Sequence, residues 1–330
     1  MAPVPLTFGC ASVSSDGRFN TPAAVQELFS VLLEVGITRL DSAQLYGDCE
    51  DLLGRSNVSA RGFVIDGKHP GGWAPGSLVP DNITASLHST LASLGVDRLD
   101  TYFIHGPDRG LPLGPALQAL DGLHRQGLFS RLGLSNFSAD EVAAVHGLAT
   151  ANGWLAPSVY QGNYSAFARR QEAEVLPVLR GLGISFCAYS PLAGGFLARR
   201  GAAELAGAAT GGRFAVDPED PEGTRGGLGL YRELYSSRPG LVRALAGWGR
   251  IADDAGCSCP AELGYRWVAW HSALDAGLGD SVTVGASSID QLRKTAEWVA
   301  KGRLSEETCD RIDALWREIQ NEAPLDNLHK

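Results

Sequence analysis

The sequence predicts an α/β protein with a (β/α)8 barrel, and three observations support this. Strand and helix patterns alternate along most of the 330 residues. Short apolar strands separated by single helices imply parallel pairing with right-handed crossovers. About eight such units in one chain favour a closed barrel over an open, doubly wound sheet. We therefore expect residues 1–330 to form one domain, with the functional side chains at the carboxyl ends of the strands.

The predicted strands are short apolar runs between helical patterns. They cover Ile37–Ser42, Arg61–Asp66, Leu99–Ile104, Arg131–Leu134, Pro157–Gln161, Ile184–Tyr189 and Ser281–Gly285, with a weak eighth candidate near Thr295–Val299. Thr21-Pro22 is typical of a helix start, and Gly36 ends the helix that follows. Asp81 and Ser138 are expected to cap two further helices. Helices are also predicted over Pro115–Gln126 and Gln171–Leu182.

The pattern breaks down between Gly194 and Pro239. This stretch is rich in Gly, Ala and Arg and contains the run DPEDPEG. It is too long for an ordinary connection, and long loops in compact domains are often lids. Because it follows the sixth predicted strand, we expect it to hang over the active face as a long lid loop.

Composition narrows the classes of partner. The net charge of −9 argues against a nucleic-acid partner held by phosphate neutralisation. No 18-residue apolar run is present, so no membrane span is expected. The start MAPVPLTFGCAS lacks the features of a signal peptide. The six cysteines lack zinc spacing, so we expect reduced thiols, no metal and a cytoplasmic protein.

Four polar residues stand at the ends of the first three predicted strands. Asp41 ends the first strand and Tyr46 follows it in LDSAQLYGD, Lys68 ends the second strand, and His105 ends the third in YFIHGPD. Each alone is unremarkable, because loops commonly carry polar residues. In a barrel, however, the strand ends meet at one rim. We therefore expect the four side chains to converge on one site.

Such a set suits the reduction of a carbonyl group. The carbonyl oxygen must receive a proton and be stabilised as charge develops on it. Tyr46 would donate the proton, and the Lys68 ammonium would lower the pKa of this phenol. Asp41 would hold Lys68 in place and keep it charged. His105 would orient the carbonyl oxygen.

These residues resemble the catalytic tetrad of the aldo-keto reductases, which are nicotinamide-dependent (β/α)8 enzymes. The resemblance implies that Ser135, Asn136 and Gln161 bind the nicotinamide carboxamide and that the Tyr189 ring stacks on nicotinamide. It also implies that the loop from Ser190 through Leu197, which includes Leu192 and Gly194, covers the pyrophosphate. Three stretches are similar to sequences of the aflatoxin-aldehyde and succinic-semialdehyde reductase branch, namely HGPDRGLP, VYQGNYSAFARRQEAEVLP and GASSIDQL. That branch implies a homodimer.

The stretch VGASSIDQLRKT corresponds to the segment with which the family binds the adenosine 2′-phosphate. Gly285 and Gln291 stand where many relatives carry basic residues. Ser287, Ser288 and Lys294 remain as phosphate ligands, and Arg200 and Arg213 of the lid are further candidates. We expect NADPH to be preferred over NADH, mainly because the family prefers it. An ordinary helix cap at Ser288 is compatible with this role.

The substrate end is less determined by the sequence. Trp73, Phe137, Tyr231 and Arg232 are candidate substrate contacts, because aromatic rings suit aryl carbonyl compounds and arginine suits a carboxylate. Three alternatives stay open: a non-catalytic, cofactor-sensing subunit on the same fold, a dedicated ketoreductase of a natural-product pathway, and a barrel hydrolase that pairs Asp41 with Asp66 or Asp108.

Overall fold

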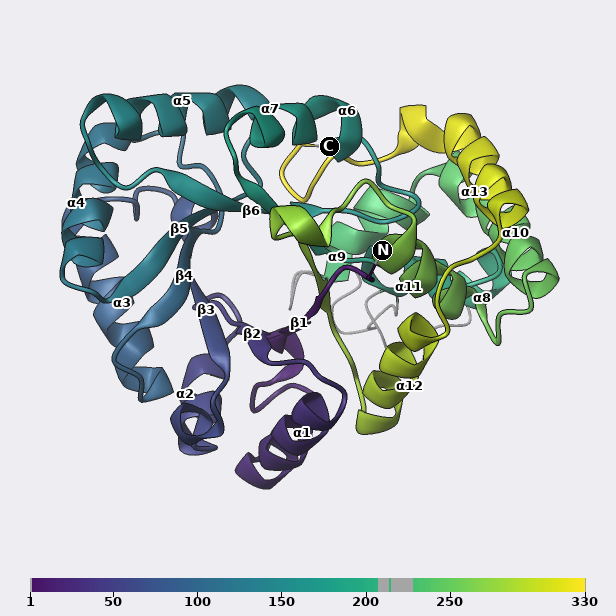
Figure 1. The fold of residues 1–330 in the computed structure, drawn as a ribbon, viewed down its shortest axis with the longest axis horizontal. Coiled ribbons are helices and arrows are strands. Elements are labelled where there is room, and N and C mark those ends of the chain that lie inside the picture. Colours follow the sequence, from purple (N-terminus) through teal and green to yellow (C-terminus); the bar gives the residue numbers. More distant parts are fainter. Residues whose placement is uncertain (1, 207–213, 215–227, 330) are drawn as a thin grey trace.

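Eight parallel strands close into a barrel in the order in which they occur in the chain (Figure 1). The computed structural model describes residues 2–206, 214 and 228–329. The strands are β1 (Leu6–Gly9), β2 (Arg39–Asp41), β3 (Val64–His69), β4 (Leu99–Ile104), β5 (Phe129–Ser135), β6 (Pro157–Asn163), β7 (Ser185–Tyr189) and β8 (Ser281–Val284). The predicted (β/α)8 class is therefore confirmed. The carboxyl ends of all eight strands point to one face.

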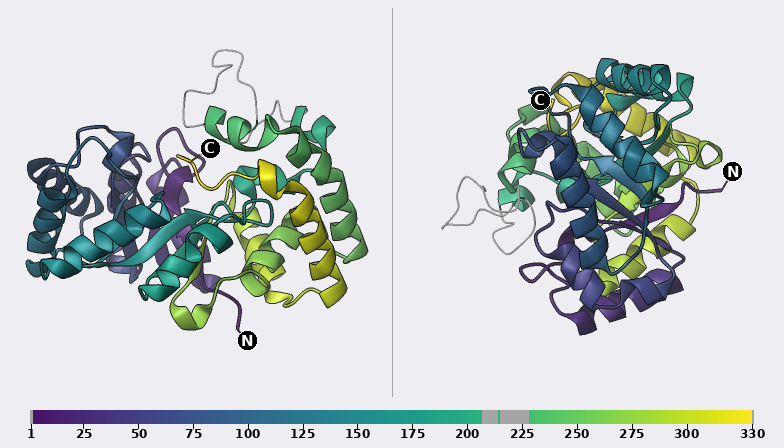
Figure 2. Two further views of the ribbon diagram at one scale, coloured as in Figure 1. Left: turned by 90° about the horizontal axis from the view of Figure 1, so that it is seen from above. Right: turned by 90° about the vertical axis from the view of Figure 1, so that its left-hand side faces the viewer.

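Helices surround the barrel in both views of Figure 2. They are α1 (Pro22–Glu34), α2 (Cys49–Arg55), α3 (Pro80–Leu94), α4 (Leu113–Arg125), α5 (Ala139–Ala151), α6 (Gln171–Glu174), α7 (Leu176–Gly181), α8 (Ala202–Ala206), α9 (Leu228–Tyr231), α10 (Pro239–Asp254), α11 (Pro260–Trp270), α12 (Ile289–Ala300) and α13 (Glu306–Ile319). The predicted caps form at Thr21, which accepts from Ala24 N at 3.2 Å, and at Ser138, which makes a capping box with Glu141. Asp81 instead lies in the first turn of α3, whose N-cap is Val79.

The predicted eighth strand near Thr295–Val299 is wrong, because this segment is part of α12. Its buried residues Leu292, Thr295 and Val299 follow one another at intervals of three and four, which is the spacing of a helix face. The remaining strand is β1, near the start of the chain. It pairs with both β2 and β8, and thereby closes the barrel.

The long segment between Gly194 and Pro239 follows the seventh strand, β7, rather than the sixth, because β1 precedes the first predicted strand. It is also not wholly a loop. It contains a 3-10 segment, η4 (Ala193–Ala198), the helices α8 and α9, and a π-helical turn, η6 (Arg232–Ser236). Arg213, a predicted cofactor ligand, lies outside the described residues.

After α13 the chain returns to the active face. Gln171 Nε2 donates to Leu325 O at 3.0 Å, and His329 Nε2 lies 2.7 Å from Arg109 Nη2 in the loop after β4. Leu328 packs close to Gly106, since a Cβ added at that glycine would lie 3.1 Å from Leu328 Cδ1 and from Trp73 Nε1. The C-terminal tail therefore lies beside the predicted site, and in Figure 2 (left) it is on the opposite side of the molecule from the N-terminus.

No helix in the described part of the chain is long and apolar enough to cross a membrane.

Candidate active site

The predicted tetrad comes from three neighbouring strands. Asp41 is the last residue of β2, Lys68 is the fifth residue of β3, and His105 directly follows β4. Tyr46 lies in the connection between β2 and α2. Lys68 is paired in register with Phe103 of β4. Parallel pairing thus brings residues that are far apart in sequence to one rim of the barrel.

Lys68 and Asp41 form a buried ion pair. Lys68 Nζ donates to Asp41 Oδ1 at 2.6 Å and to the main-chain oxygen of Ser42 at 2.9 Å. The Lys68 side chain has no exposed surface. Burial alone would lower the pKa of Lys68, but Asp41 and then Tyr46 raise it above the ordinary value of 10.5. The lysine is therefore an ammonium throughout the physiological pH range.

Tyr46 lies against this ammonium, with Lys68 Nζ 5.1 Å from the centre of its ring. Burial raises the pKa of Tyr46 to about 12, while Lys68 acts to lower it. The net lowering that the sequence suggested is therefore wrong, because removing the phenolate from water costs more than the ammonium restores. The phenol is protonated at neutral pH and can give its proton away.

His105 faces the Tyr46 ring edge to face, with ring centres 5.9 Å apart and an angle of 83° between the planes. Burial, and then Lys68, hold the pKa of His105 well below 6.5, so the imidazole is neutral. Its Nδ1 is buried and has no hydrogen-bond partner among the described residues. Trp73 Nε1 donates to the His105 main-chain oxygen at 3.2 Å, which places the indole beside the imidazole.

The residues predicted to bind the nicotinamide carboxamide lie against the tetrad. Asn136 Nδ2 donates to the main-chain oxygen of His105 at 2.9 Å and to Ser135 Oγ at 3.1 Å. Tyr189 OH donates to Asn136 Oδ1 at 2.7 Å. Gln161 Nε2 donates to the same Asp41 oxygen as Lys68, at 2.9 Å. These side chains form two hydrogen-bonded groups, one attached to the main chain of His105 and the other to Asp41 and Lys68.

The backbone is strained around these groups. Asn136, Ser190 and Ala193 have φ of 60°, 56° and 51°, in the left-handed region. Non-glycine residues are held there only where surrounding structure fixes them, and such residues concentrate at functional sites. Here the two loops that carry them are those predicted to contact the cofactor.

The loop after β7 rests on Tyr231. Gly194 has φ of 69°, and a Cβ there would lie 2.2 Å from Tyr231 Cδ1, so a glycine is required for both backbone and space. Tyr231 OH is 2.7 Å from Ser190 Oγ. Leu192 is buried, with its Cδ2 2.6 Å from the position a Cβ would take on Gly264 of α11. The predicted pyrophosphate loop is therefore held in place by its packing against Tyr231 and α11.

The predicted 2′-phosphate site is the exposed start of α12. Ser288 caps the helix by accepting from Gln291 N at 3.2 Å. Gln291 Oε1 accepts from both the N–H and the hydroxyl of Ser287 at 2.8 Å. Gly285, after β8, and Lys294 are exposed. The cap and an anion site are compatible, because free N–H groups and the helix dipole both favour a phosphate.

Two predicted ligands are placed differently from the rest. Both terminal nitrogens of Arg200 donate to the Asp253 carboxylate of α10, at 2.8 and 2.9 Å, so this guanidinium already has an anion. Phe137 is in the hydrophobic core with 1% exposed surface, and its own main-chain oxygen accepts from Tyr160 OH at 2.7 Å. A substrate contact through the Phe137 ring is therefore unsupported.

Two other substrate candidates, Tyr231 and Arg232, belong to the segment after β7. Tyr231 and Arg232 are consecutive, at the junction of α9 and η6. Arg232 Nη2 is buried and has no hydrogen-bond partner among the described residues. An unpaired guanidinium nitrogen is costly unless an anion or water meets it. The arrangement thus suits a negatively charged group on a bound molecule.

The sequence reasoning missed several residues behind the tetrad. Ser42 accepts from Lys68 through its main chain, and Arg39 binds Asp66, the strand partner of Asp41. The spacing of Arg39 and Asp41 and of Asp66 and Lys68 could have indicated these contacts, because residues two apart on a strand share a face. Asp66 appeared only as a mate for Asp41 in a hydrolase. Its carboxylate is instead taken by an arginine.

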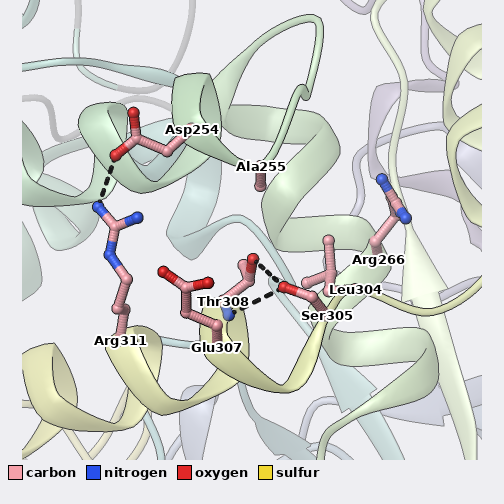
Figure 3. A pocket seen from close by; sticks show the side chains of 8 residues that line it. All are labelled: Asp254, Ala255, Arg266, Leu304, Ser305, Glu307, Thr308 and Arg311. Carbon is pink, nitrogen blue, oxygen red and sulfur yellow. Dashed lines mark hydrogen bonds and ion pairs between the residues drawn. The ribbon is translucent and has the colours of Figure 1, made fainter.

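A separate hollow of about 230 Å³ lies among the outer helices α10, α11 and α13 (Figure 3). Its walls include Asp254, Arg266, Ser305, Glu307, Thr308 and Arg311. Arg311 is paired with Asp254 at 2.8 Å, and Ser305 caps α13. No tetrad residue lines this hollow, so it is separate from the reaction site.

The fold and site together define a class: a (β/α)8 oxidoreductase with a Tyr–Lys–Asp–His set at the carboxyl ends of its strands. A sequence profile of the Aldo/keto reductase family matches residues 5–317. The oxidoreductase sirO of Leptosphaeria maculans is 34% identical over 99% of this chain and 98% of its own length. Aflatoxin B1 aldehyde reductase member 4 of Homo sapiens is 34% identical over 92% of this chain and 91% of its own.

Aflatoxin B1 aldehyde reductase member 2 of Rattus norvegicus is 33% identical over 93% of this chain and 84% of its own. The chain belongs to the aldo/keto reductase family, as the sequence motifs suggested. It is an oxidoreductase that reduces carbonyl groups, which leaves the barrel hydrolase without support.

Proposed function

We propose that the chain reduces an aldehyde or ketone to an alcohol with NADPH, using Tyr46 as the proton donor. The observation that carries this proposal is the buried Lys68–Asp41 pair at 2.6 Å beside the Tyr46 ring. Family members use nicotinamide cofactors, and the bound cofactor would supply a hydride to the carbonyl carbon. The protein's own groups must then supply the proton and stabilise the oxygen.

The proton comes from the phenol. Tyr46 holds its proton at neutral pH, with a pKa of about 12. As the O–H bond breaks, negative charge develops on the phenol oxygen, and the nearby Lys68 ammonium stabilises it. Asp41 fixes the ammonium in place, and Gln161 helps to fix Asp41. Acid catalysis of this kind contributes roughly 10²- to 10⁴-fold in rate.

His105 orients the carbonyl oxygen. Because the imidazole is neutral, it carries one N–H, which can donate to the oxygen without giving up its proton. A charged imidazole here would compete with Tyr46 as the acid. The edge-to-face contact of His105 with Tyr46 supports a shared target for the two donors.

The residues present fit a nicotinamide cofactor. Ser135, Asn136 and Gln161 would hold the carboxamide, and Tyr189 would stack on its ring. Their hydrogen bonds to the tetrad and to one another and the strained backbone at Asn136 support this assignment. For the adenosine 2′-phosphate we propose Ser287, Ser288 and Lys294, beside Gly285 and Gln291. Arg200 contributes little, since Asp253 already holds it.

The deciding experiment follows cofactor oxidation with an activated aldehyde such as 4-nitrobenzaldehyde. The reductase should turn over with NADPH, and Tyr46→Phe should not. Tight NADPH binding without turnover across a panel of aldehydes and ketones would instead favour the cofactor-sensing subunit. A dedicated ketoreductase would turn over one class of ketone far faster than simple aldehydes.

The substrate class is proposed from Trp73 and Arg232. Trp73 stands beside His105 and offers an apolar wall. Arg232 Nη2 is buried and has no hydrogen-bond partner among the described residues, which favours an aldehyde that carries a carboxylate. Arg232→Met should raise the KM for succinic semialdehyde about 10-fold or more, but leave the KM for butanal nearly unchanged. Equal effects on the two aldehydes would remove Arg232 from substrate binding.

Two further proposals follow the family branch. We propose that the chain is a single domain and forms a homodimer, which sedimentation of the purified protein would test. We also propose a cytoplasmic location. All six cysteines lie in the described part of the chain and none forms a disulfide, which is typical of a reducing compartment. Fluorescent tagging in the source cells would test the location.

A further inference from the structure

A column of charged side chains runs from the amino-terminal part of the barrel to the tetrad. It consists of Arg131, Asp100, Arg39, Asp66, Asp41 and Lys68. The exposed fraction of the side chain falls along it from 36% at Arg131, through 28% at Asp100 and Arg39, to 7%, 4% and 0% at the last three. Three acids and three bases make the column neutral as a whole, and the two acids Asp66 and Asp41 are neighbours within it.

Short contacts hold the column together. Arg131 Nη2 donates to Asp100 Oδ2 at 2.6 Å, and Arg39 Nη1 donates to the same oxygen at 2.7 Å. Arg39 Nη1 also reaches Asp66 Oδ1 at 2.7 Å and Oδ2 at 3.0 Å. The N–H of Thr101 on β4 donates to Asp66 Oδ1 at 3.1 Å. Asp66 is thereby fixed from both neighbouring strands.

Asp66 is adjacent to the catalytic pair without touching the reacting groups. It is the register partner of Asp41 on β2, and it lies two residues before Lys68 on the same face of β3. Two carboxylates side by side in a buried place repel each other. Arg39 on one side and Lys68 on the other compensate this repulsion, and the Asp66 charge helps to raise the pKa of Lys68.

We propose that Asp66, held by Arg39, is a positioning residue that sets the electrostatic potential at Lys68 and, through Lys68, the proton affinity of Tyr46. The proposal rests on the roles proposed above for Tyr46 and Lys68. Neither Asp66 nor Arg39 is needed to contact substrate or cofactor.

The sign of the effect follows from the charges. Removing the negative charge of Asp66 leaves the Lys68 ammonium less compensated, so the phenolate of Tyr46 is stabilised and its pKa falls. Removing the positive charge of Arg39 leaves Asp66 uncompensated at alkaline pH, so the pKa of Tyr46 rises. Two variants of one ion pair should therefore shift the same titration in opposite directions.

The experiment measures kcat/KM for aldehyde reduction and for alcohol oxidation in alkaline solution up to about pH 12, because the pKa of Tyr46 is about 12. In Asp66→Asn the pH-dependent limb assigned to Tyr46 should move to lower pH by about one unit, an ordinary size for a charge effect inside a protein. In Arg39→Gln it should move to higher pH. Asp280→Asn is the matched control, because Asp280 is also buried and paired with an arginine, Arg180, but outside the column. It should leave the limb in place.

A second readout avoids turnover. The absorbance of the Tyr46 phenolate, obtained as the difference between each variant and the same variant carrying Tyr46→Phe, should titrate with the same ordering. If the parent protein shows no turnover, the proposed function fails, and this titration still decides the role of Asp66. If Asp66→Asn does not fold, Arg39→Gln decides it. Limbs that stay unmoved, or that move in the same direction, would overturn the proposal.

Discussion

The ring of His105 stands edge to face against the ring of Tyr46, 5.9 Å away between centres. Two proton-bearing groups of different acidity, a neutral imidazole and a protonated phenol, thus lie side by side. The phenol alone is backed by an ammonium, at 5.1 Å from its ring centre. This asymmetry separates the two roles: one group orients the carbonyl oxygen and the other gives it a proton.

Replacing the phenol by phenyl should isolate the proton-donating role. Tyr46→Phe should lower kcat by at least about 10²-fold, because the phenylalanine ring has no hydroxyl proton to give to the carbonyl oxygen. The Kd of NADPH, measured by protein fluorescence, should change by less than about threefold, since the ring is retained. A Phe variant with parental turnover would remove Tyr46 from its proposed role.

Removing the ammonium should cost both turnover and stability. Lys68→Met leaves the Asp41 carboxylate buried without its cation, and breaking a buried pair in this way costs about 3–5 kcal/mol in the free energy of unfolding. Urea denaturation would measure the loss. Adding Asp41→Asn to Lys68→Met should recover part of it, because the uncompensated charge is then gone.

The comparison for this prediction is a surface pair. Arg170 and Glu174 are partly exposed, at 33% and 43%. Arg170→Met should cost no more than about 1 kcal/mol. Equal losses for Lys68→Met and Arg170→Met would contradict the buried ion pair.

Stability should decline in mildly acidic solution. Burial lowers the pKa of His69 to about 4 from 6.5, and the Gly71 N–H donates to its Nδ1 at 3.0 Å. The folded state therefore binds fewer protons than the unfolded state between these values. The free energy of unfolding should fall as pH drops from 6.5 to 4, by up to about 3 kcal/mol from this residue.

Urea titrations at several pH values would test this decline. His69→Asn keeps an acceptor for the Gly71 N–H and should flatten the dependence on pH. His88→Asn, at an exposed position of α3, should not. Parallel curves for the parent and His69→Asn would rule out His69 as the source.

The start of α12 should control the choice between cofactors. Lys294→Gln should raise the Kd of NADPH about 10-fold, the usual size for one lost charge-assisted hydrogen bond, and leave that of NADH unchanged. Arg200→Gln should affect neither, because Arg200 is bound to Asp253. Calorimetric titration with both cofactors would measure these constants. A loss of NADH affinity in Lys294→Gln would point to a structural role instead.

The sequence was sufficient for the barrel class and for the convergence of Asp41, Tyr46, Lys68 and His105, because strand ends in such a fold share one rim. It misplaced the eighth strand for a physical reason. β1 has only four residues, too few for a periodic signal, whereas Thr295–Val299 is apolar enough to imitate a strand. Its helical spacing is visible only when Leu292 is included.

The pKa shifts and the contacts between distant residues could not be predicted from the sequence. Burial and Lys68 have opposite effects on the pKa of Tyr46. Their balance depends on how much hydration the phenol loses on folding, which a sequence motif does not indicate. The pairing of Arg200 with Asp253 joins residues 53 positions apart, and no local pattern indicates it. The tail contact between His329 and Arg109 spans 220 positions.

That tail has a practical consequence for handling the protein. Leu328 packs near Gly106 and Trp73, and His329 contacts Arg109, so a purification handle fused after residue 330 would begin next to the reaction site. The opposite end of the polypeptide emerges on the far side of the barrel (Figure 2). For kinetic measurements the affinity tag should therefore be placed there.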